Sequence, residues 1–377
     1  MSPNTIHRPS FEREATIPVP EAIDVLREDN VAGMRIERVR ASDGFEAHNP
    51  ERREALQEEM DEWDLQLRRH PEWQMPQQDS ETRLPIVDPA NKASAWFYAT
   101  ESQQAWGALM PTALALYPLQ RPESASLPNG VPIDERSREF FMHSIDAIGI
   151  RTRAEIMTGL SLQSAAKQEG KDLKWVSIAC GAAVPVLNAV SQIKEEFPDK
   201  EPHLKLVDID PNALAFAKKL AEEHGLEEGR DFTTRRSNIF KELHARDTLV
   251  QEIGPGSAQM VDALGIFEYL PDNVASSMLQ KMHQLAAPGG SVVIGNMLDD
   301  RRQLDFNRRA VGWPKIYPRS LEELTELVTS AGIDINTVTA YIPEDGVYAV
   351  ISIEKPYPEL SGQKALLGNM GQHAVDH

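Results

Sequence analysis

The chain has 377 residues, of which 41% are hydrophobic, and its 39 Lys and Arg against 58 Asp and Glu give a net charge of −19. This length allows one large domain or two ordinary ones, and the negative charge argues against a nucleic-acid partner. Because the sequence has no run of 18 apolar residues, no signal-like start and a single cysteine, we expect no membrane span and a cytoplasmic location.

Residues 1–134 are expected to form a mainly helical capping region with a disordered start. Helical periodicity with heavy surface charge covers about 21–70, a proline-rich connector covers 71–90, and an apolar segment at 93–119 predicts one or two helices interrupted at Pro111. Four of the six tryptophans lie in this region. They either form the wall of an apolar pocket or anchor a helical layer onto the rest of the protein.

Residues 135–357 alternate between strand-like and helix-like segments, which predicts a mostly parallel sheet. The expected strands are 174–180, 204–208, 231–234, 258–264, 290–297, 336–342 and 347–354. A short Asp-Gly turn separates the last two, which are expected to pair as an antiparallel hairpin. The predicted fold class is therefore α/β, a Rossmann-like doubly wound sheet that ends in this hairpin, and residues 358–377 are expected to form a loose tail.

The segment 175–210 has the pattern of a strand, a turn of small residues, a helix and a second strand that ends in an acid. The small residues around Gly181 let the backbone approach a ligand closely. Asp208 ends the second strand, where its carboxylate can accept both hydroxyls of a ribose. This pairing fits either a nicotinamide dinucleotide or S-adenosylmethionine. Because the G-x-G-x-x-G pattern that cradles a pyrophosphate is missing, the ligand without phosphate fits better.

Four segments in order resemble the class I S-adenosylmethionine-dependent methyltransferases: SIACGAA (177–183), LVDIDPNAL (206–214), VDALGIFEYLPD (261–272) and LAAPGGSVVIGN (285–296). The resemblance covers about half of the chain. Its later part, with GIFEYLPDN, APGG, GNM and GWPKIYPRS, is most similar to the branch that contains bacterial 3-hydroxy-fatty-acid methyl ester synthases. The resemblance implies S-adenosylmethionine as cofactor and a C-terminal hairpin in the sheet.

The cofactor-binding residues are expected after the first four strands. They are Ser177, Ala179, Gly181, Asp208, Ile209, Asn238, Ile239 and Gly265. The resemblance implies that Ile209 packs on the adenine ring, and that Asn238 stands where the family commonly has an Asp. The amide of Asn238 either pairs with the adenine or bonds only its own backbone. The sequence departs from the family at Ser177, where an acid is common, and at Ala179 and Ala183, where glycines are common.

The expected catalytic residues are Asp262, Tyr269 and His143. Asp262 is an acid inside an apolar strand, and perturbed acids gather at active sites, unless the side chain reaches water at the sheet edge. His143 is placed to deprotonate a hydroxyl group. Arg151 or its neighbour Arg153 is expected to bind a carboxylate of the cofactor or of an acid substrate. The expected substrate-binding residues are Arg151, Glu268, Trp313 and Tyr317. A purely structural role on a helix or loop is the alternative for His143, Tyr269, one of the two arginines, and the segment with Trp313 and Tyr317.

We therefore predict an S-adenosylmethionine-dependent methyltransferase that acts on a small organic acceptor at an oxygen atom of a carboxylate or hydroxyl group. One alternative is a non-catalytic binding or scaffold protein, which the alanine-substituted turn favours. Others are a nicotinamide-dependent oxidoreductase and a methyltransferase that acts on a protein. The histidines are dispersed and no cysteine pair exists, so no metal site is expected. Monomer and dimer remain equally compatible with the sequence.

Overall fold

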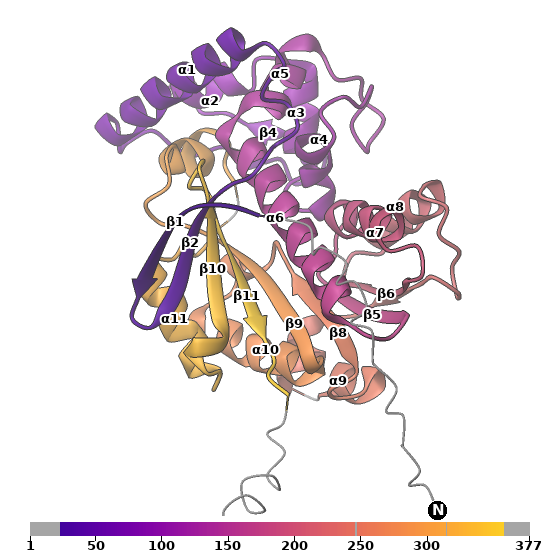
Figure 1. The fold of residues 1–377 in the computed structure, drawn as a ribbon. Coiled ribbons are helices and arrows are strands. Elements are labelled where there is room, and N and C mark those ends of the chain that lie inside the picture. Colours follow the sequence, from indigo (N-terminus) through magenta and orange to yellow (C-terminus); the bar gives the residue numbers. More distant parts are fainter. Residues whose placement is uncertain (1–22, 246, 314, 358–377) are drawn as a thin grey trace, which may run out of the picture.

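The computed structural model describes residues 23–245, 247–313 and 315–357. These residues form a nine-stranded sheet with helices on both faces and a helical layer at one end of the sheet (Figure 1). The strands are β1 Asp24–Val31, β2 Met34–Arg40, β5 Asp172–Ile178, β6 Glu201–Asp208, β7 Phe232–Arg236, β8 Ala258–Ala263, β9 Ala286–Met297, β10 Val338–Pro343 and β11 Tyr348–Glu354. A separate small sheet pairs β3 Gln77–Gln78 with β4 Pro85–Ile86.

The helices alternate with the strands in the second half of the chain and dominate the first half. They are α1 Pro50–Arg69, α2 Lys92–Phe97, α3 Glu101–Gly107, α4 Tyr117–Gln120, α5 Glu135–His143, α6 Ile145–Lys167, α7 Val184–Glu196, α8 Pro211–Glu223, α9 Thr248–Ile253, α10 Asp272–Leu285 and α11 Leu321–Ser330. Short 3₁₀ or π turns cover Ala113–Leu116, Phe240–Ala245, Phe267–Tyr269, Phe306–Ala310 and Ile335–Thr337. Within the described residues, no helix is both long enough and apolar enough to cross a membrane.

The strand order is β1-β2-β10-β11-β9-β8-β5-β6-β7. Strands β7, β6, β5, β8 and β9 run parallel, and β11 pairs antiparallel with both β9 and β10. The predicted doubly wound fold and its C-terminal hairpin are thus confirmed. The chain leaves β5 in one direction toward β6 and later returns to its other side as β8. This reversal opens a crevice at the carboxyl ends of β5 and β8, where such folds bind ligands.

Two hydrophobic cores hold the helices on the sheet. Helices α10 and α11 cover one face and bury apolar side chains such as Leu279 and Val328 against β8, β9, β10 and β11. Helices α6, α7 and α8 cover the other face, where Leu160, Leu187 and Ala217 join the core. Because helices cover both faces of the sheet, the ends of the strands rather than their faces border the crevice.

The expectation of a helix from residue 21 was wrong for residues 24–40. These residues form an antiparallel hairpin whose second strand, β2, pairs parallel with β10 and so extends the sheet. The turn consists of Ala32 and Gly33, both with positive φ, which is the two-residue turn that suits hairpin strands. Met34 and Ile36, on either side of the exposed Arg35, are fully buried. The burial of alternate residues favours a strand here, although the charged residues predicted a helix.

The helical layer has its own aromatic core. Phe97, Trp106, Phe140 and Phe306 pack edge to face with ring centroids between 4.8 and 6.2 Å apart. Trp106 also lies 6.0 Å from Trp313, which follows the β9 strand. The N-terminal region is mainly helical beyond residue 50, as predicted, and its core is continuous with residues from the second half of the chain.

Candidate active site

The turn after β5 has a left-handed backbone at three alternate residues. Ala179, Gly181 and Ala183 have φ angles of 52°, 56° and 57°. This conformation costs an alanine roughly 1–2 kcal/mol, so two strained residues are kept where glycines would be relaxed. Helix α7 begins directly after them, at Val184, so the N–H groups of its first turn lie beside the crevice. The alanines therefore preserve the shape of a ligand-binding turn.

Asp208 ties this turn to the end of β6. The backbone N–H of Gly181 donates to Oδ2 of Asp208 at 2.8 Å, and that of Asp210 donates to Oδ1 at 2.9 Å. Burial raises the pKa of Asp208, an effect that these N–H donors oppose. A carboxylate has about four lone-pair positions, so each oxygen of Asp208 can accept a further hydrogen bond. A pair of ribose hydroxyls provides two such donors.

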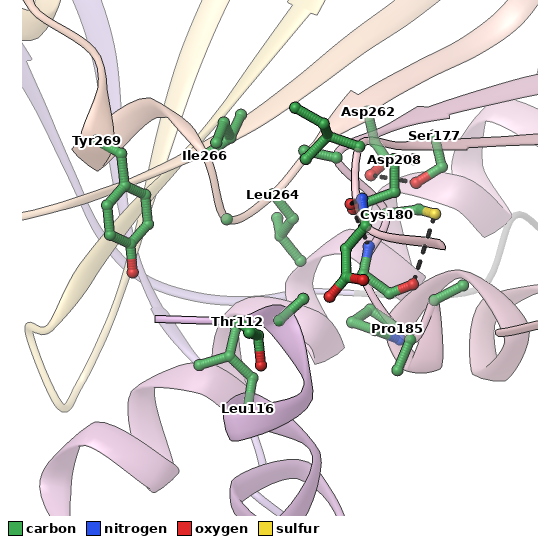
Figure 2. A pocket seen from close by; sticks show the side chains of 18 of the residues that line it. Thr112, Leu116, Ser177, Cys180, Pro185, Asp208, Asp262, Leu264, Ile266 and Tyr269 are labelled. Carbon is green, nitrogen blue, oxygen red and sulfur yellow. Dashed lines mark hydrogen bonds between the residues drawn. The ribbon is translucent and has the colours of Figure 1, made fainter. Parts of the chain in front are cut away.

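A cavity of about 520 Å³ opens at this end of the sheet. The turn, Asp208 and Asp262 line one side of it, and residues of the N-terminal region line the opposite side (Figure 2). The N-terminal residues are Pro111, Thr112, Ala113, Leu116 and Gln120. A Cβ atom on Gly181 would lie 2.8 Å from the Cβ atom of Ala113, so the N-terminal region contacts the turn itself.

Apolar side chains flank the cavity near Asp208. Ile209 and Phe240 line it and are 52% and 46% exposed, and Ile239 lines it as a buried residue. Large hydrophobic side chains that stay exposed around a cavity are typical of a ligand-binding rim. Ile209 and Ile239 therefore line the cavity, and the adenine contact that the resemblance implies for Ile209 stays a prediction. Phe240 is a further apolar lining residue that was not expected from the sequence.

Asp262 lies beneath the cavity and is 3% exposed, so its side chain does not reach water at a sheet edge. Nε1 of Trp175 donates to its Oδ1 at 2.7 Å, and Oγ of Ser177 donates to its Oδ2 at 3.1 Å. Burial raises the pKa of Asp262 to about 7, although both donors favour the ionised form. No Lys, Arg or His among the described residues forms an ion pair with it.

Tyr269 and Trp313 form the end of the cavity that lies away from Asp208. Nε1 of Trp313 donates to the hydroxyl of Tyr269 at 2.7 Å, and burial raises the pKa of that hydroxyl well above its usual range. Gly265 lines the cavity between them and the turn, and a Cβ atom there would come within 3.1 Å of Nη2 of Arg153. The backbone of the loop after β8 therefore lies against a guanidinium group.

Arg153 is the only arginine that lines the cavity among the described residues. Its side chain and that of Glu268 are each 4% exposed, and Nη1 of Arg153 lies 3.5 Å from Oε1 of Glu268. Its guanidinium also stacks on Tyr348, 4.2 Å from the ring centroid. Nε and Nη1 of Arg153, and Oε2 of Glu268, have no hydrogen-bond partner in the described part of the chain. Buried polar atoms without partners are uncommon and indicate a place for a ligand or water.

Five of the residues selected from the sequence do not line the cavity, namely Arg151, His143, Asn238, Tyr317 and Glu268. Nη2 of Arg151 pairs with Asp43 at 2.7 Å, and its other N–H groups donate to backbone carbonyls, which leaves the group no access to a cavity ligand. His143 is buried beside His48. Oδ1 of Asn238 accepts from the backbone N–H of Lys241. The backbone N–H of Tyr317 donates to the carbonyl of Glu268.

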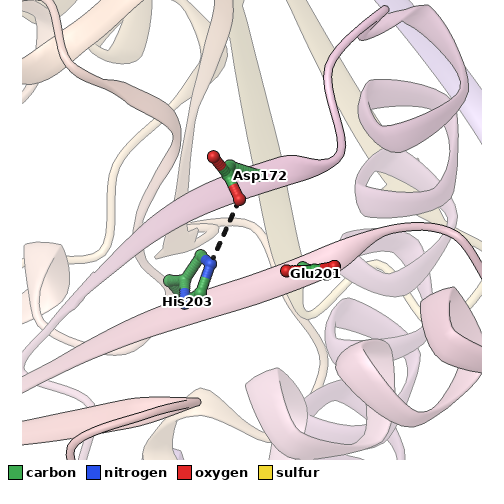
Figure 3. A group of neighbouring side chains, drawn as sticks. All are labelled: Asp172, Glu201 and His203. Carbon is green, nitrogen blue, oxygen red and sulfur yellow. Dashed lines mark hydrogen bonds and ion pairs between the residues drawn. The ribbon is translucent and has the colours of Figure 1, made fainter.

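A group of potential metal ligands lies at the opposite end of the strands. Asp172 and Glu201 begin β5 and β6, and Nε2 of His203 lies 3.4 Å from Oδ1 of Asp172 (Figure 3). One ligand atom of each of the three residues lies within 4.8 Å of the others. Both acids are exposed, and nothing else in the structure points to an ion there. The prediction that the chain has no metal site stays a prediction.

The sequence matches a family described as "Putative methyltransferase" over residues 124–355, which is more than half of the chain. The chain belongs to this methyltransferase family. The expected class of S-adenosylmethionine-dependent methyltransferases is thereby confirmed, and the cavity fits this cofactor through its turn, Asp208 and the apolar rim. The closer branch of methyl ester synthases stays a prediction. A comparison with curated proteins finds no match.

Several solved structures are similar to this chain at low sequence identity. A protein from Bordetella parapertussis described as a possible exported protein is 16% identical, covers 71% of this chain and 86% of its own, and has a TM-score of 0.51. An O-methyltransferase family protein from Burkholderia thailandensis is 16% identical, with coverages of 78% and 83% and a TM-score of 0.41. The CurJ carbon methyltransferase is 14% identical, with coverages of 75% and 76% and a TM-score of 0.45.

Proposed function

We propose that this methyltransferase transfers the methyl group of S-adenosylmethionine to a carboxylate oxygen of a small, mainly apolar organic acid. The observation that carries this proposal is Arg153, a buried guanidinium that lines the cavity end closed by Tyr269 and Trp313, and whose Nε and Nη1 have no hydrogen-bond partner among the described residues. A planar guanidinium matches a carboxylate better than it matches any neutral oxygen acceptor. The apolar residues around it, such as Leu116, suit the rest of such an acid.

The turn and the ends of β6 and β8 would hold the cofactor. Backbone groups of 179–183 would approach it, Asp208 would accept from the ribose, and Ile209 and Ile239 would enclose the adenine. When bound, S-adenosylmethionine supplies a methyl group on a sulfonium, and displacement by an acceptor oxygen leaves the electron pair on sulfur and forms the methyl ester. The protein contributes position and the exclusion of water.

Arg153 would fix the acid so that one carboxylate oxygen faces the methyl group. Glu268 and Tyr348 hold the guanidinium from behind, so little side-chain freedom is lost when the acid binds. A carboxylate is already ionised at neutral pH, so no general base is required. A hydroxyl acceptor would need one, and His143 lies outside the cavity while Glu268 faces Arg153.

Residues 1–134 would act as the cap over the acceptor, apart from the β1–β2 hairpin, which belongs to the sheet. The segment 111–116 contacts both the turn and the acceptor end of the cavity. Such a cap excludes water from the reacting atoms. We also propose that the enzyme works in the cytoplasm, and both proposals remain independent of the acceptor class.

The test compares apolar carboxylic acids with primary alcohols of the same chain length as acceptors of a labelled methyl group. We expect esters from the acids, recognised by the release of labelled methanol in base. Arg153→Leu should raise the KM for the acid about tenfold or more, because a charge-assisted hydrogen bond contributes roughly 1.5–3 kcal/mol, whereas Arg153→Lys should lose less. Binding of S-adenosylhomocysteine should change less than threefold.

The exposed Arg302, which lies outside the cavity, provides the matched control as Arg302→Leu. It should leave the KM for the acid unchanged. Methylation of the alcohols alone, or of neither panel, would contradict the carboxylate acceptor. Loss of S-adenosylhomocysteine binding in Arg153→Leu would instead assign Arg153 to the carboxylate of the cofactor and remove the main support for an acid acceptor.

A further inference from the structure

Asp262 is a buried carboxylate that borders the cofactor cavity without any cationic partner in the described residues. Its two hydrogen-bond donors, Trp175 and Ser177, are both neutral. Taking an ionised carboxylate out of water without a counter-ion is unfavourable by several kcal/mol. A buried carboxylate without a counter-ion that lines a ligand cavity favours the binding of a cationic group there.

Asp262 also lies next to Ser177, the position at which the sequence lacks the acid that is common in the family. Strands β5 and β8 are parallel neighbours, and Ser177 and Asp262 are direct partners in their register. Their side chains lie on the same face and are joined by the hydrogen bond seen in Figure 2. An acid at either position would therefore present its carboxylate to nearly the same place beneath the turn.

The ligand offers the matching charge. S-adenosylmethionine carries a sulfonium and an α-ammonium group, and both have to leave water when the cavity encloses them. Of the other acids that line the cavity, Asp208 is the proposed acceptor of the ribose hydroxyls and Asp210 is the N-cap of α8. Arg153 has the wrong sign for either cation.

We propose that Asp262 is the counter-ion for a cationic group of S-adenosylmethionine, and that β8 thereby supplies the acid that β5 lacks at Ser177. Asp262 is then a cofactor-binding residue that takes no part in proton transfer. This inference rests on the use of S-adenosylmethionine as cofactor, and it does not depend on the nature of the acceptor.

The first test measures binding of S-adenosylmethionine and S-adenosylhomocysteine by calorimetry to the full-length protein and to Asp262→Asn. The substitution keeps the size of the side chain and removes its charge. We expect at least a tenfold loss of affinity for S-adenosylmethionine. An equal loss for S-adenosylhomocysteine would identify the ammonium as the partner, whereas a loss confined to S-adenosylmethionine would identify the sulfonium.

The second test exchanges the two partners. Asp262→Ser alone should lose affinity as Asp262→Asn does, and the double variant Ser177→Asp with Asp262→Ser should recover it to within about threefold of the wild type. A purely structural role for Asp262 would not predict this recovery. The matched control is Asp64→Asn, which alters a buried aspartate of α1 that does not line the cavity.

The outcomes of these tests distinguish the choice of cofactor from the role of Asp262. Failure of the wild-type protein to bind S-adenosylhomocysteine would contradict the cofactor itself. Normal binding by the wild type with unchanged affinity in folded Asp262→Asn would overturn the role of Asp262 alone. If Asp262→Asn does not fold, the exchange variant decides, and a folded exchange variant without recovered affinity would also overturn the proposal.

Discussion

His143 shows how a buried side chain can link the stability of this protein to pH. It is 1% exposed, its Nδ1 atom has no hydrogen-bond partner among the described residues, and its ring lies 5.7 Å from that of His48. Burial, with additional repulsion from Arg53, His48 and Arg151, lowers the pKa of His143 to about 4. The folded protein thus holds this imidazole in its neutral form across the neutral range.

The unfolded chain binds a proton at His143 below pH 6.5, whereas the folded chain does so only near pH 4. The contribution of His143 to stability is therefore complete above pH 6.5 and is lost as the pH falls from 6.5 toward 4. We expect the urea midpoint of the wild type to drop over this range, and His143→Phe to drop less. Parallel decreases in the two proteins would contradict this prediction.

Arg151 and Arg153 show what the sequence could not decide. Two residues apart on a helix, their side chains point about 200° away from each other, so at most one of them faces the cavity. The sequence gives no phase for α6 that would choose between them, because residues on both sides of this helix are buried. The structure places Arg153 at the cavity and Arg151 against Asp43.

At the scale of elements, strand β2 of the β1–β2 hairpin is part of the folded core, whereas β1 is mostly exposed. Ile36 is fully buried in the core that α10 and α11 form with the sheet, whereas Leu26 in β1 is 44% exposed. The hairpin therefore contributes to the stability of the whole sheet although it precedes the methyltransferase motifs by more than a hundred residues.

We expect Ile36→Ala to lower the free energy of unfolding by about 2–4 kcal/mol, the usual effect of a large-to-small change in a core. The matched control is Leu26→Ala in the partner strand, which should change it by less than about 0.5 kcal/mol. Chemical denaturation of both variants measures the difference. Similar values for the two variants, or a separate early transition for the hairpin, would show that β2 is not integrated into the core.

The strands of the second half could be predicted because each is a short apolar run between turn residues. The predicted strand 204–208 lies within β6, and 258–264 corresponds to β8. The N-terminal hairpin was missed because its alternation is short and surrounded by charged residues. The turn at Ala32 and Gly33 was the signal that could have revealed it.

At the scale of the whole molecule, the cavity forms where three parts of the chain meet. The turn after β5 and the loop after β8 supply the cofactor side, and the segment 111–116 closes it from the N-terminal region. The motifs could identify the first two, because family patterns mark them. The contact between Ala113 and Gly181 could not be predicted, since no periodicity or spacing relates residues that far apart.

The central claim is that this cavity binds S-adenosylmethionine rather than a nicotinamide dinucleotide. The most direct measurement is calorimetric titration of the purified protein with S-adenosylhomocysteine, with NAD as the comparison ligand. We predict micromolar binding of S-adenosylhomocysteine with one site per chain, and no binding of NAD. Binding of NAD without binding of S-adenosylhomocysteine would contradict it.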